Sequence, residues 1–283
     1  MKIECAFLDS GTGGIPYMLY LKKHHPKITC TYLADCKNFP YGEKTQEQIV
    51  ECSSSAIKTI IQKWNVSTVI IACNTISVSA LSKLRSIFPD ISIVGTVPAI
   101  KLASELSKNK RIGLLATKAT VESEYCKNLQ KEFAQDCHLF SRADATLVSF
   151  IEKNLFTASE EEKLEAVRPA VNYFIENDCD TVILGCTHFI HFATLIEKLA
   201  NGKFITVDSR DGVINQALKV IEDNRQSKNR SDVKIKNENI FTLALDFLDN
   251  TKDCSLYVSA TDKNLEHYKN ICTHFSIPWA GVI

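Results

Sequence analysis

The octamer TVIIACNT (68–75) is nearly repeated as TVILGCTH (181–188). Each copy is an apolar run, rich in β-branched residues, that ends at a cysteine and is followed by polar residues. Such runs are typical of strands buried on both faces of a parallel sheet. Ligands bind at the carboxyl ends of the strands in open parallel sheets. The pair of octamers therefore predicts that Cys73 and Cys186 lie at equivalent, functional positions.

Short apolar runs alternate with longer amphipathic stretches along the rest of the chain. Strands are predicted at residues 3–10, 28–35, 67–73, 91–96, 111–117, 181–186 and 203–209. Helices are predicted at residues 16–26, 45–64, 77–88, 121–133, 160–177 and 191–200. Thr45 and Gln48 should cap the second helix, and Pro169 should kink the fifth. The alternation predicts an α/β fold of mostly parallel sheets flanked by helices.

Residues 2–97 and 109–208 follow the same order of elements, and each ends in an apolar strand. This order predicts a duplicated unit, with two pseudo-symmetric α/β lobes and an active site in the cleft between them, a usual place for ligands. The first lobe is expected to comprise residues 1–97 plus 209–283, and the second residues 98–208.

The last quarter of the chain is less regular. Residues 224–237 are rich in serine, asparagine and lysine, which predicts an exposed loop. Residues 241–249 and 254–275 are expected to form strand-like segments and a helix that return to the first lobe.

Composition argues against several classes of protein. The 33 basic and 33 acidic residues give no net charge, which does not favour nucleic acid or an acidic membrane as a partner. The chain has no stretch near the roughly 18 apolar residues of a membrane span, and Glu4 and Asp9 interrupt the apolar start. Eleven cysteines without a CxxC pair predict reduced thiols in the cytoplasm.

The stretch FLDSGTGG (7–14) ends a predicted strand with Asp9 and Ser10 and continues into a glycine-rich turn. Glycines permit a close backbone approach, and the following helix points its amino end at the same place. This pattern indicates a site for a carboxylate or phosphate, or else a plain tight turn. The later stretch DCKNFPYGEKT (35–45) has turn chemistry and by itself predicts a surface loop.

Polar residues follow both thiols: Asn74-Thr75 after the first and Thr187-His188 after the second. Hydroxyls, an amide and free backbone N–H groups can hold a carboxylate or an amine. A thiol beside a polar loop or a helix amino end should have its pKa lowered toward neutrality.

Four uses of the two thiols can be compared. Disulfide exchange requires a close pair such as CxxC, and a cysteine phosphatase requires an arginine a few residues on. A zinc site built from Cys186, His188 and His191 would have an unusual spacing. The remaining use is two-base catalysis, in which one thiol removes a proton from one face of a small molecule and the other returns it. Asp9 would then serve Cys73, and His188 would serve Cys186.

At these residues the chain resembles the cofactor-independent glutamate racemases of the aspartate/glutamate racemase superfamily. The resemblance covers residues 1–210 and a carboxy-terminal segment. Its matching stretches are FLDSGTGG (7–14), DCKNFPYGEKT (35–45), IIACNTIS (70–77), IVGTVPAI (93–100), IGLLATKATVES (112–123), VILGCTHF (182–189), VDS (207–209) and YVSATDKNLEHYKNICTHF (257–275).

The resemblance implies an isomerase that interconverts L- and D-glutamate without pyridoxal phosphate or metal and supplies D-glutamate for bacterial peptidoglycan. It implies a cytoplasmic enzyme with glutamate as substrate, no nucleic-acid or membrane partner, and homodimers as a common assembly. The implied acid/base thiols are Cys73 and Cys186, assisted by Asp9, His188 and Glu152. The implied substrate-binding residues are Asp9, Ser10, Tyr41, Gly42, Asn74, Thr75, Thr187 and His188.

The chain departs from the pattern of these racemases in three places. Asp144-Ala145 stands where many members have Cys-Pro, which puts the role of the nearby Glu152 in question. Residues 15–17 are Ile-Pro-Tyr in place of Leu-Ser-Val, and a proline suits the first turn of a helix. Val97 is the apolar variant of a position that is otherwise Glu.

Two alternatives stay open. One is a related enzyme that acts on aspartate, another amino acid or a malonate-type acid, although aspartate racemases typically show Glu where this chain has His188. The other is a binding protein that keeps the fold without catalysis, against which the intact pair of cysteines argues.

Overall fold

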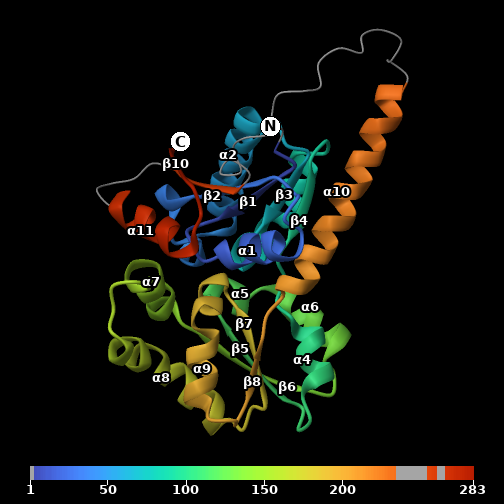
Figure 1. Cartoon of the computed structure of the whole chain (residues 1–283). Coiled ribbons are helices and arrows are strands. Elements are labelled where there is room, and N and C mark those ends of the chain that lie inside the picture. The colour runs from blue at the N-terminus through green and yellow to red at the C-terminus, as the bar shows by residue number, and fades with distance from the viewer. Residues whose placement is uncertain (1–2, 234–253, 260–264) are drawn as a thin grey trace.

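The computed structural model describes residues 3–233, 254–259 and 265–283, in which the strands form two parallel sheets. One sheet has six strands in the order β10-β9-β2-β1-β3-β4, and the other has four in the order β6-β5-β7-β8. Figure 1 shows the six-stranded sheet above and the four-stranded sheet below, each with helices packed on it. The predicted α/β class is confirmed.

The first half, called here the six-stranded half, contains two separated parts of the chain. Its strands are β1 (Cys5–Asp9), β2 (Cys30–Ala34), β3 (Thr68–Ile71), β4 (Ser92–Gly95), β9 (Cys254–Val258) and β10 (Trp279–Val282). Its helices are α1 (Ile15–His24), α2 (Gln46–Trp64), α3 (Asn74–Ile87), α10 (Arg210–Val233), α11 (Leu265–Phe275) and the 3-10 turns η1 (Cys36–Asn38) and η2 (Tyr41–Glu43).

The second half, called here the four-stranded half, is continuous in sequence. Its strands are β5 (Arg111–Ala116), β6 (His138–Ala143), β7 (Thr181–Gly185) and β8 (Ile205–Val207). Its helices are α4 (Ile100–Leu106), α5 (Lys118–Val121), α6 (Glu124–Phe133), α7 (Ala145–Asn154), α8 (Glu160–Glu176), the 3-10 helix η3 (Thr187–Phe192) and α9 (Ala193–Ala200).

The two sheets repeat one strand order. Within the larger sheet β2-β1-β3-β4 run side by side, and the smaller sheet has β6-β5-β7-β8 in matching places. Every residue of β1, β3 and β7 is buried, as expected for strands covered on both faces. The predicted duplication is therefore confirmed, and Cys73 and Cys186 follow the third strand of each copy.

The carboxy-terminal strands β9 and β10 complete the larger sheet, with β9 paired to β2. The strand-like segment expected at residues 241–249 lies outside the described residues. The division into residues 1–97 plus 209–283 and residues 98–208 stays a prediction.

Local sequence signals for helix ends agree with the structure in two places. Thr45 and Gln48 form the expected capping box at the start of α2. Pro16 lies in the first turn of α1, where its missing N–H costs no helical hydrogen bond. Pro169 lies inside α8, which continues past it to Glu176.

The prediction of a loop from residue 224 is wrong for residues 224–233, because α10 extends to Val233. The polar side chains of Asn224 and Arg225 lie on this helix and form hydrogen bonds with residues in and beside the six-stranded sheet. The Asn224 amide donates to Thr68 Oγ1 at 3.0 Å, and Arg225 Nε donates to Glu4 Oε1 at 2.7 Å. Helix α10 is therefore docked on the strands by its polar residues.

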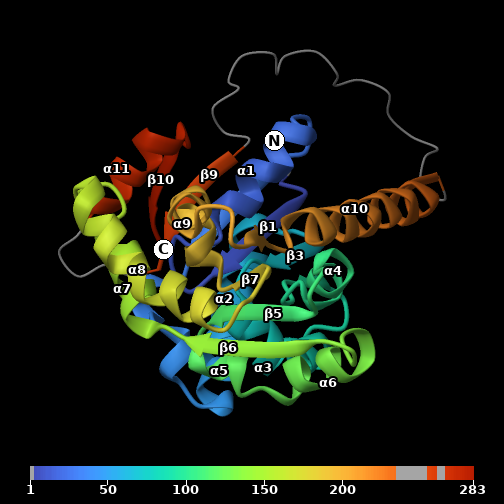
Figure 2. The same cartoon turned by 90° about the horizontal axis from the view of Figure 1, so that it is seen from below.

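Strand β6 carries no clear apolar pattern and is missing from the predicted strands. All six of its residues are partly or fully exposed, because it is the outer strand of the smaller sheet, as Figure 2 shows. In the described parts of the chain, no helix is long and apolar enough to cross a membrane.

Candidate active site

Cys73 and Cys186 each follow a buried strand and precede a helix. Cys73 is the N-cap residue of α3, and Cys186 is the N-cap residue of η3. Both side chains are buried, and both line one pocket of about 820 Å³ between the two halves. The structure thus brings the two predicted thiols to one cavity, from opposite halves of the molecule.

Asp9 lies behind Cys73. Its carboxylate accepts a hydrogen bond from Ser10 N at 2.7 Å and one from Thr187 Oγ1, across the interface, at 3.1 Å. Burial raises the pKa of Asp9, although the charge of His188 and then the nearby Cys73 thiol act to lower it. Asp9 is thus the charged group nearest in effect to Cys73, and its assistance to that thiol stays a prediction.

The pKa of Cys73 does not follow the expectation. Burial, and then the charge of Asp9, raise it well above its ordinary value, although a backbone N–H at Ile76 acts in the opposite direction. The helix amino end is present, but it is outweighed by desolvation and by a neighbouring carboxylate. Cys73 is therefore held as a neutral thiol.

His188 lies beside Cys186 and connects it to Glu152. The ring Nδ1 is 3.7 Å from Cys186 Sγ, and the ring Nε2 is 2.8 Å from Glu152 Oε2. Burial favours the neutral ring, but the hydrogen bonds and charges of Cys186 and Glu152 outweigh it and raise the pKa of His188 well above 6.5. Cys186 therefore faces a cationic hydrogen-bond donor.

Glu152 is buried and binds the glycine turn of the other half. Its Oε2 accepts from Thr12 N at 3.0 Å and from Thr12 Oγ1 at 2.7 Å. Burial raises the pKa of Glu152, but hydrogen bonds from His188 and Thr12 more than offset it and leave the pKa below 4.5. A Cβ on Gly11 would lie 2.8 Å from Glu152 Oε1, which explains the glycine.

This contact changes the interpretation of FLDSGTGG. The turn does receive a carboxylate, as its pattern predicts, but the carboxylate is the chain's own Glu152. Gly13 faces the His188 ring, which a side chain there would displace. The turn is therefore filled from within the protein and packs the two halves together.

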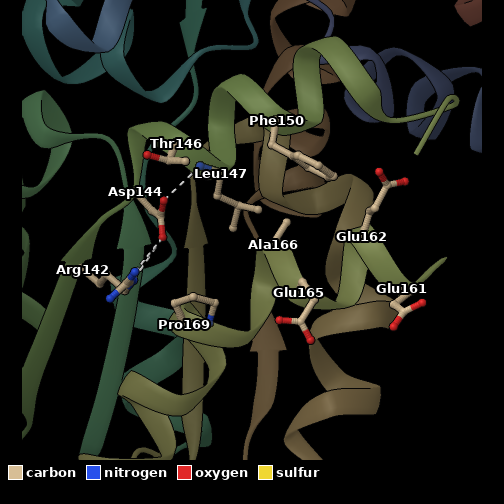
Figure 3. A pocket seen from close by; sticks show the side chains of 10 residues that line it. All are labelled: Arg142, Asp144, Thr146, Leu147, Phe150, Glu161, Glu162, Glu165, Ala166 and Pro169. Atoms are coloured by element: carbon tan, nitrogen blue, oxygen red, sulfur yellow. Dashed lines mark hydrogen bonds and ion pairs between the residues drawn. The ribbon is translucent and has the colours of Figure 1, made fainter. Parts of the chain in front are cut away.

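The departure at Asp144-Ala145 leaves Glu152 in place. Asp144 Oδ1 accepts from Leu147 N at 3.0 Å and so caps α7, the helix that carries Glu152. Its other oxygen pairs with Arg142, as Figure 3 shows at one end of a second pocket, between α7 and α8. At the far end of α7, His267 Nε2 lies 2.7 Å from the carbonyl of Glu152.

The residues expected to hold the substrate form two layers. Those that line the catalytic pocket are Ser10, Tyr41, Gly42, Asn74, Thr75 and Thr187. Asp9 and His188 lie behind them and contact the thiols. The Tyr41 hydroxyl is engaged outside the pocket, where it donates to Asp35 Oδ2 at 2.6 Å.

Asn74 supplies an independent sign of a ligand. Its side chain is 2% exposed, and within the described residues neither its amide nitrogen nor its oxygen has a hydrogen-bond partner. Unsatisfied buried amides are rare because they cost free energy. At the amino end of α3 and on the pocket wall, this amide is placed for a polar ligand.

Several pocket residues were not anticipated individually. Thr117, directly after β5, has its hydroxyl 2.9 Å from that of Thr75 and joins the halves at the pocket. Lys118 and Lys153 line the same pocket. The duplication could have pointed to Thr117, because β5 corresponds to β1 and the polar residues after β1 belong to the site.

Cys186, His188 and Glu152 form a chain of contacts that is called here the relay. Tyr32 and His191 lie around it. The Tyr32 hydroxyl donates to Gly11 O at 3.0 Å and thus supports the glycine turn. Burial and the charge of His188 lower the pKa of His191 to about 4. A zinc site at Cys186, His188 and His191 was one of the four uses considered for the thiols. It gains no support, because the described residues contain no cluster suited to a metal ion.

Comparisons with known proteins agree on one family. A family model described as Asp/Glu/Hydantoin racemase matches residues 20–217. The glutamate racemase of Treponema pallidum (strain Nichols) is 37% identical over 219 residues, which is 77% of this chain and 81% of that protein. The glutamate racemase of Haemophilus ducreyi is 36% identical over 222 residues, 78% of this chain and 83% of that protein.

Two solved structures are similar over nearly their full lengths. Escherichia coli glutamate racemase, in complex with L-glutamate and the activator UDP-MurNAc-Ala, has a TM-score of 0.80 at 26% identity and covers 99% of this chain and 98% of its own. Francisella tularensis glutamate racemase, in complex with D-glutamate, has a TM-score of 0.74 at 22% identity over 99% and 96%. The second likeness bears on the fold.

Proposed function

The chain belongs to the Asp/Glu/hydantoin racemase family, and on that premise we propose that it is a glutamate racemase. The reaction would interconvert L- and D-glutamate by removing the α-proton on one face and delivering a proton to the other, and would supply D-glutamate for peptidoglycan. The observation that carries the proposal is the pair of buried cysteines that face one pocket from equivalent strands. The named relatives and the glutamate-bound neighbour support this substrate.

The surroundings of the thiols suggest how they divide the work. Beside the imidazolium of His188, Cys186 can act as the thiolate that takes the α-proton, because a cation stabilises an ionised sulfur. Cys73, kept protonated by burial and Asp9, can give its proton to the opposite face. The C–H bond breaks toward Cys186, its electron pair passes to the α-carbon, and the S–H bond of Cys73 breaks to form the new C–H bond. The reverse reaction exchanges the roles.

The main barrier is the weak acidity of the α-proton, since negative charge develops on the α-carbon and its carboxylate. A buried pocket with fixed donors can stabilise such charge better than water can. Helix α3 begins at Asn74, so its free N–H groups and the unpartnered Asn74 amide are placed to receive a carboxylate. Asp9 and the hydroxyls of Ser10 and Thr187 are suited to an ammonium group.

The test is incubation of the purified protein with L-glutamate in D2O without pyridoxal phosphate, with optical rotation and the α-proton NMR signal followed together. Both signals should decay in the wild type, and the optical rotation should not decay in Cys73→Ala or Cys186→Ala. Cys52→Ala, which removes a partly exposed thiol on α2 outside the pocket, is the matched control and should behave as wild type.

The alternatives give other outcomes. Decay with aspartate or another small acid but not with glutamate would place the protein elsewhere in the family. No decay with any of these acids would favour a binding protein. A cytoplasmic location and a homodimer remain part of the proposal, and fractionation and sedimentation measurements would check them.

A further inference from the structure

The chain passes between the two sheets at two crossovers. The first crossover, residues 96–99, joins β4 to α4, and the second, Asp208–Ser209, joins β8 to α10. Any change in the relative orientation of the halves must be absorbed at these segments, because the strands on either side are fixed in their sheets. Groups that hold both crossovers therefore control the distance across the pocket.

Tyr17, on α1, lies between the two crossovers. Its side chain is fully buried, and its hydroxyl is 2.9 Å from Ser209 Oγ in the second crossover. Burial raises the pKa of Tyr17, while Ser209 and then Thr96, from the first crossover, act to lower it. Thr96 Oγ1 is itself buried without a hydrogen bond of good geometry to any described residue. The hydrogen bond of the phenol therefore holds the second crossover.

A second tyrosine strengthens the attachment of α1 to the second crossover. Tyr20, one turn after Tyr17, donates to Asp211 Oδ1 at 2.9 Å in the first turn of α10. Asp208 and Arg210 form an ion pair at 2.8 Å that stiffens the same segment. Helix α1 is therefore hydrogen-bonded to the segment through which the chain returns to the six-stranded half.

The amino end of α1 continues from the glycine turn beside Asp9 and Glu152. Ile15 N donates to Thr12 O at 3.1 Å, and Tyr17 N donates to Gly14 O at 3.0 Å, so the helix continues directly from the glycine turn. That turn holds Glu152 of the four-stranded half through Thr12. The second crossover is therefore held by the first two turns of α1, and Glu152 by the glycine turn that directly precedes this helix.

We propose that Tyr17 is a positioning residue for proton transfer, which holds the second crossover against α1 and so fixes the separation of Cys73 and Cys186. The inference rests on the proposed racemase function. The hydrogen-bond partner of the phenol, Ser209, does not line the pocket, so the phenol acts through the backbone that it holds.

The separation matters because inversion needs both thiols within reach of one carbon. Small misplacements of a catalytic group reduce rates strongly. When the far thiol is too distant, the carbanion is reprotonated from the side on which the proton left. The α-proton then exchanges with solvent without inversion of the substrate.

The experiment measures that partition in D2O. From L-glutamate, the ratio of deuterated L-glutamate to deuterated D-glutamate is determined at low conversion in wild type and in Tyr17→Phe. We expect the ratio to rise roughly fivefold in the variant, the factor that corresponds to one lost hydrogen bond. Instability alone lowers the amount of active enzyme and scales both products equally. An unchanged ratio in folded Tyr17→Phe overturns the proposal.

Two further variants make the test specific. Ser209→Ala removes the same bond from its other end, so it should give a similar ratio, and the double variant should be no worse than either single one. Tyr173→Phe removes a hydroxyl that bonds Ser141 O inside the four-stranded half and should leave the ratio unchanged. Equal effects of Tyr173→Phe and Tyr17→Phe would contradict the proposal.

Amide hydrogen exchange gives a readout that does not depend on the substrate. Tyr17→Phe should speed exchange at residues 96–99 and 208–211 while the strands of the smaller sheet keep their protection. If wild type fails to racemise glutamate but this local change is seen, the proposed function fails and the role of Tyr17 in holding the crossovers stands. If the amide exchange rates change uniformly along the chain, or do not change, that role of Tyr17 is overturned.

Discussion

The surroundings of Cys73 and Cys186 have the same arrangement of strand and helix but differ in charge. Both cysteines are buried, follow the third strand of a matching sheet and occupy the N-cap position of the helix that follows. Cys73 lies against the carboxylate of Asp9, whereas Cys186 lies against the imidazolium of His188. Duplication of an α/β unit thus produced two equivalent thiol positions, and the neighbouring residues made them chemically unequal.

The two halves place their cysteines at equivalent backbone positions, but the groups beside the two thiols differ in charge. The carboxylate beside Cys73 favours its neutral thiol, whereas the neighbour of Cys186 is a cationic hydrogen-bond donor. A two-base reaction needs one protonated and one deprotonated group at the start of each turnover. The unequal neighbours therefore prepare one starting state, while the equal strand positions provide access to both faces of the substrate.

Removal of either thiol should have the largest effect. Cys73→Ser and Cys186→Ser should each lower racemisation by roughly a thousandfold or more, as expected for loss of an acid or base in the transition state. Each variant should still exchange the α-proton of one enantiomer in D2O, and the two should select opposite enantiomers. NMR of L- and D-glutamate measures this, and exchange of both enantiomers by either variant would break the assignment of one thiol to each face.

Loss of the charge that supports His188 should have the next largest effect. In Glu152→Gln the ring loses its carboxylate partner, so its pKa falls and Cys186 loses a cationic donor. The value of kcat should drop roughly 100-fold, within the usual contribution of a general acid or base. Glu165→Gln on the exposed face of α8 is the control, and equal loss in both variants would contradict a role for the relay.

The same pair predicts the pH dependence of stability. Glu152 has a lowered pKa, so its stabilisation is present above pH 4.5 and is lost as the pH falls through the lowered value. His188 has a raised pKa, so its stabilisation is present below pH 6.5 and is lost as the pH rises through the raised value.

We therefore expect the contribution of the pair to the free energy of unfolding to be greatest between those two pH values. In Glu152→Gln the acid limb should flatten, and the stability near pH 6 should fall by about 2 kcal/mol, as for a hydrogen bond to a charged group. Urea titrations over a range of pH values measure this. An acid limb as steep as that of wild type would remove Glu152 as its cause.

The charges at the rim of the pocket should have the smallest effect. Lys118 and Lys153 are exposed cations on its wall, and glutamate carries two carboxylates. Lys118→Gln and Lys153→Gln should each raise KM roughly threefold at low salt, and less at high salt, because exposed charges are screened. Glu43→Gln, an opposite charge on the same wall, should lower KM. Changes of one sign in all three variants would argue for altered packing instead.

Much of the fold was predictable because hydrophobic periodicity reports local structure. The continuous apolar runs at β1, β3 and β7 indicated buried parallel strands, and the cysteines that follow β3 and β7 indicated the site. Strand β6 escaped because an outer strand has little apolar pattern. The loop predicted from residue 224 was wrong because Asn224 and Arg225 find partners on distant strands, which composition does not record.

The site was predictable in its residue types and less so in its contacts. The octamers pointed to both cysteines, and the pairing of Asp9 with Cys73 followed from neighbouring strand ends. The contact of Glu152 with Thr12 joins residues 140 apart in sequence, so no local pattern indicates it. The raised pKa of Cys73 likewise depends on burial, which outweighs the helix amino end that the sequence did show.

The contact between Glu152 and Thr12 also governs how the molecule can open. Three hydrogen bonds from Thr12 to Glu152 join the halves at the glycine turn, and pulling the halves apart there would deprive a buried carboxylate of these donors. At the pocket, a single neutral bond joins Thr75 to Thr117. The less costly motion is a pivot about the glycine turn that parts these two threonines first. Substrate could then enter and leave while the relay behind Cys186 stays assembled for the next turnover.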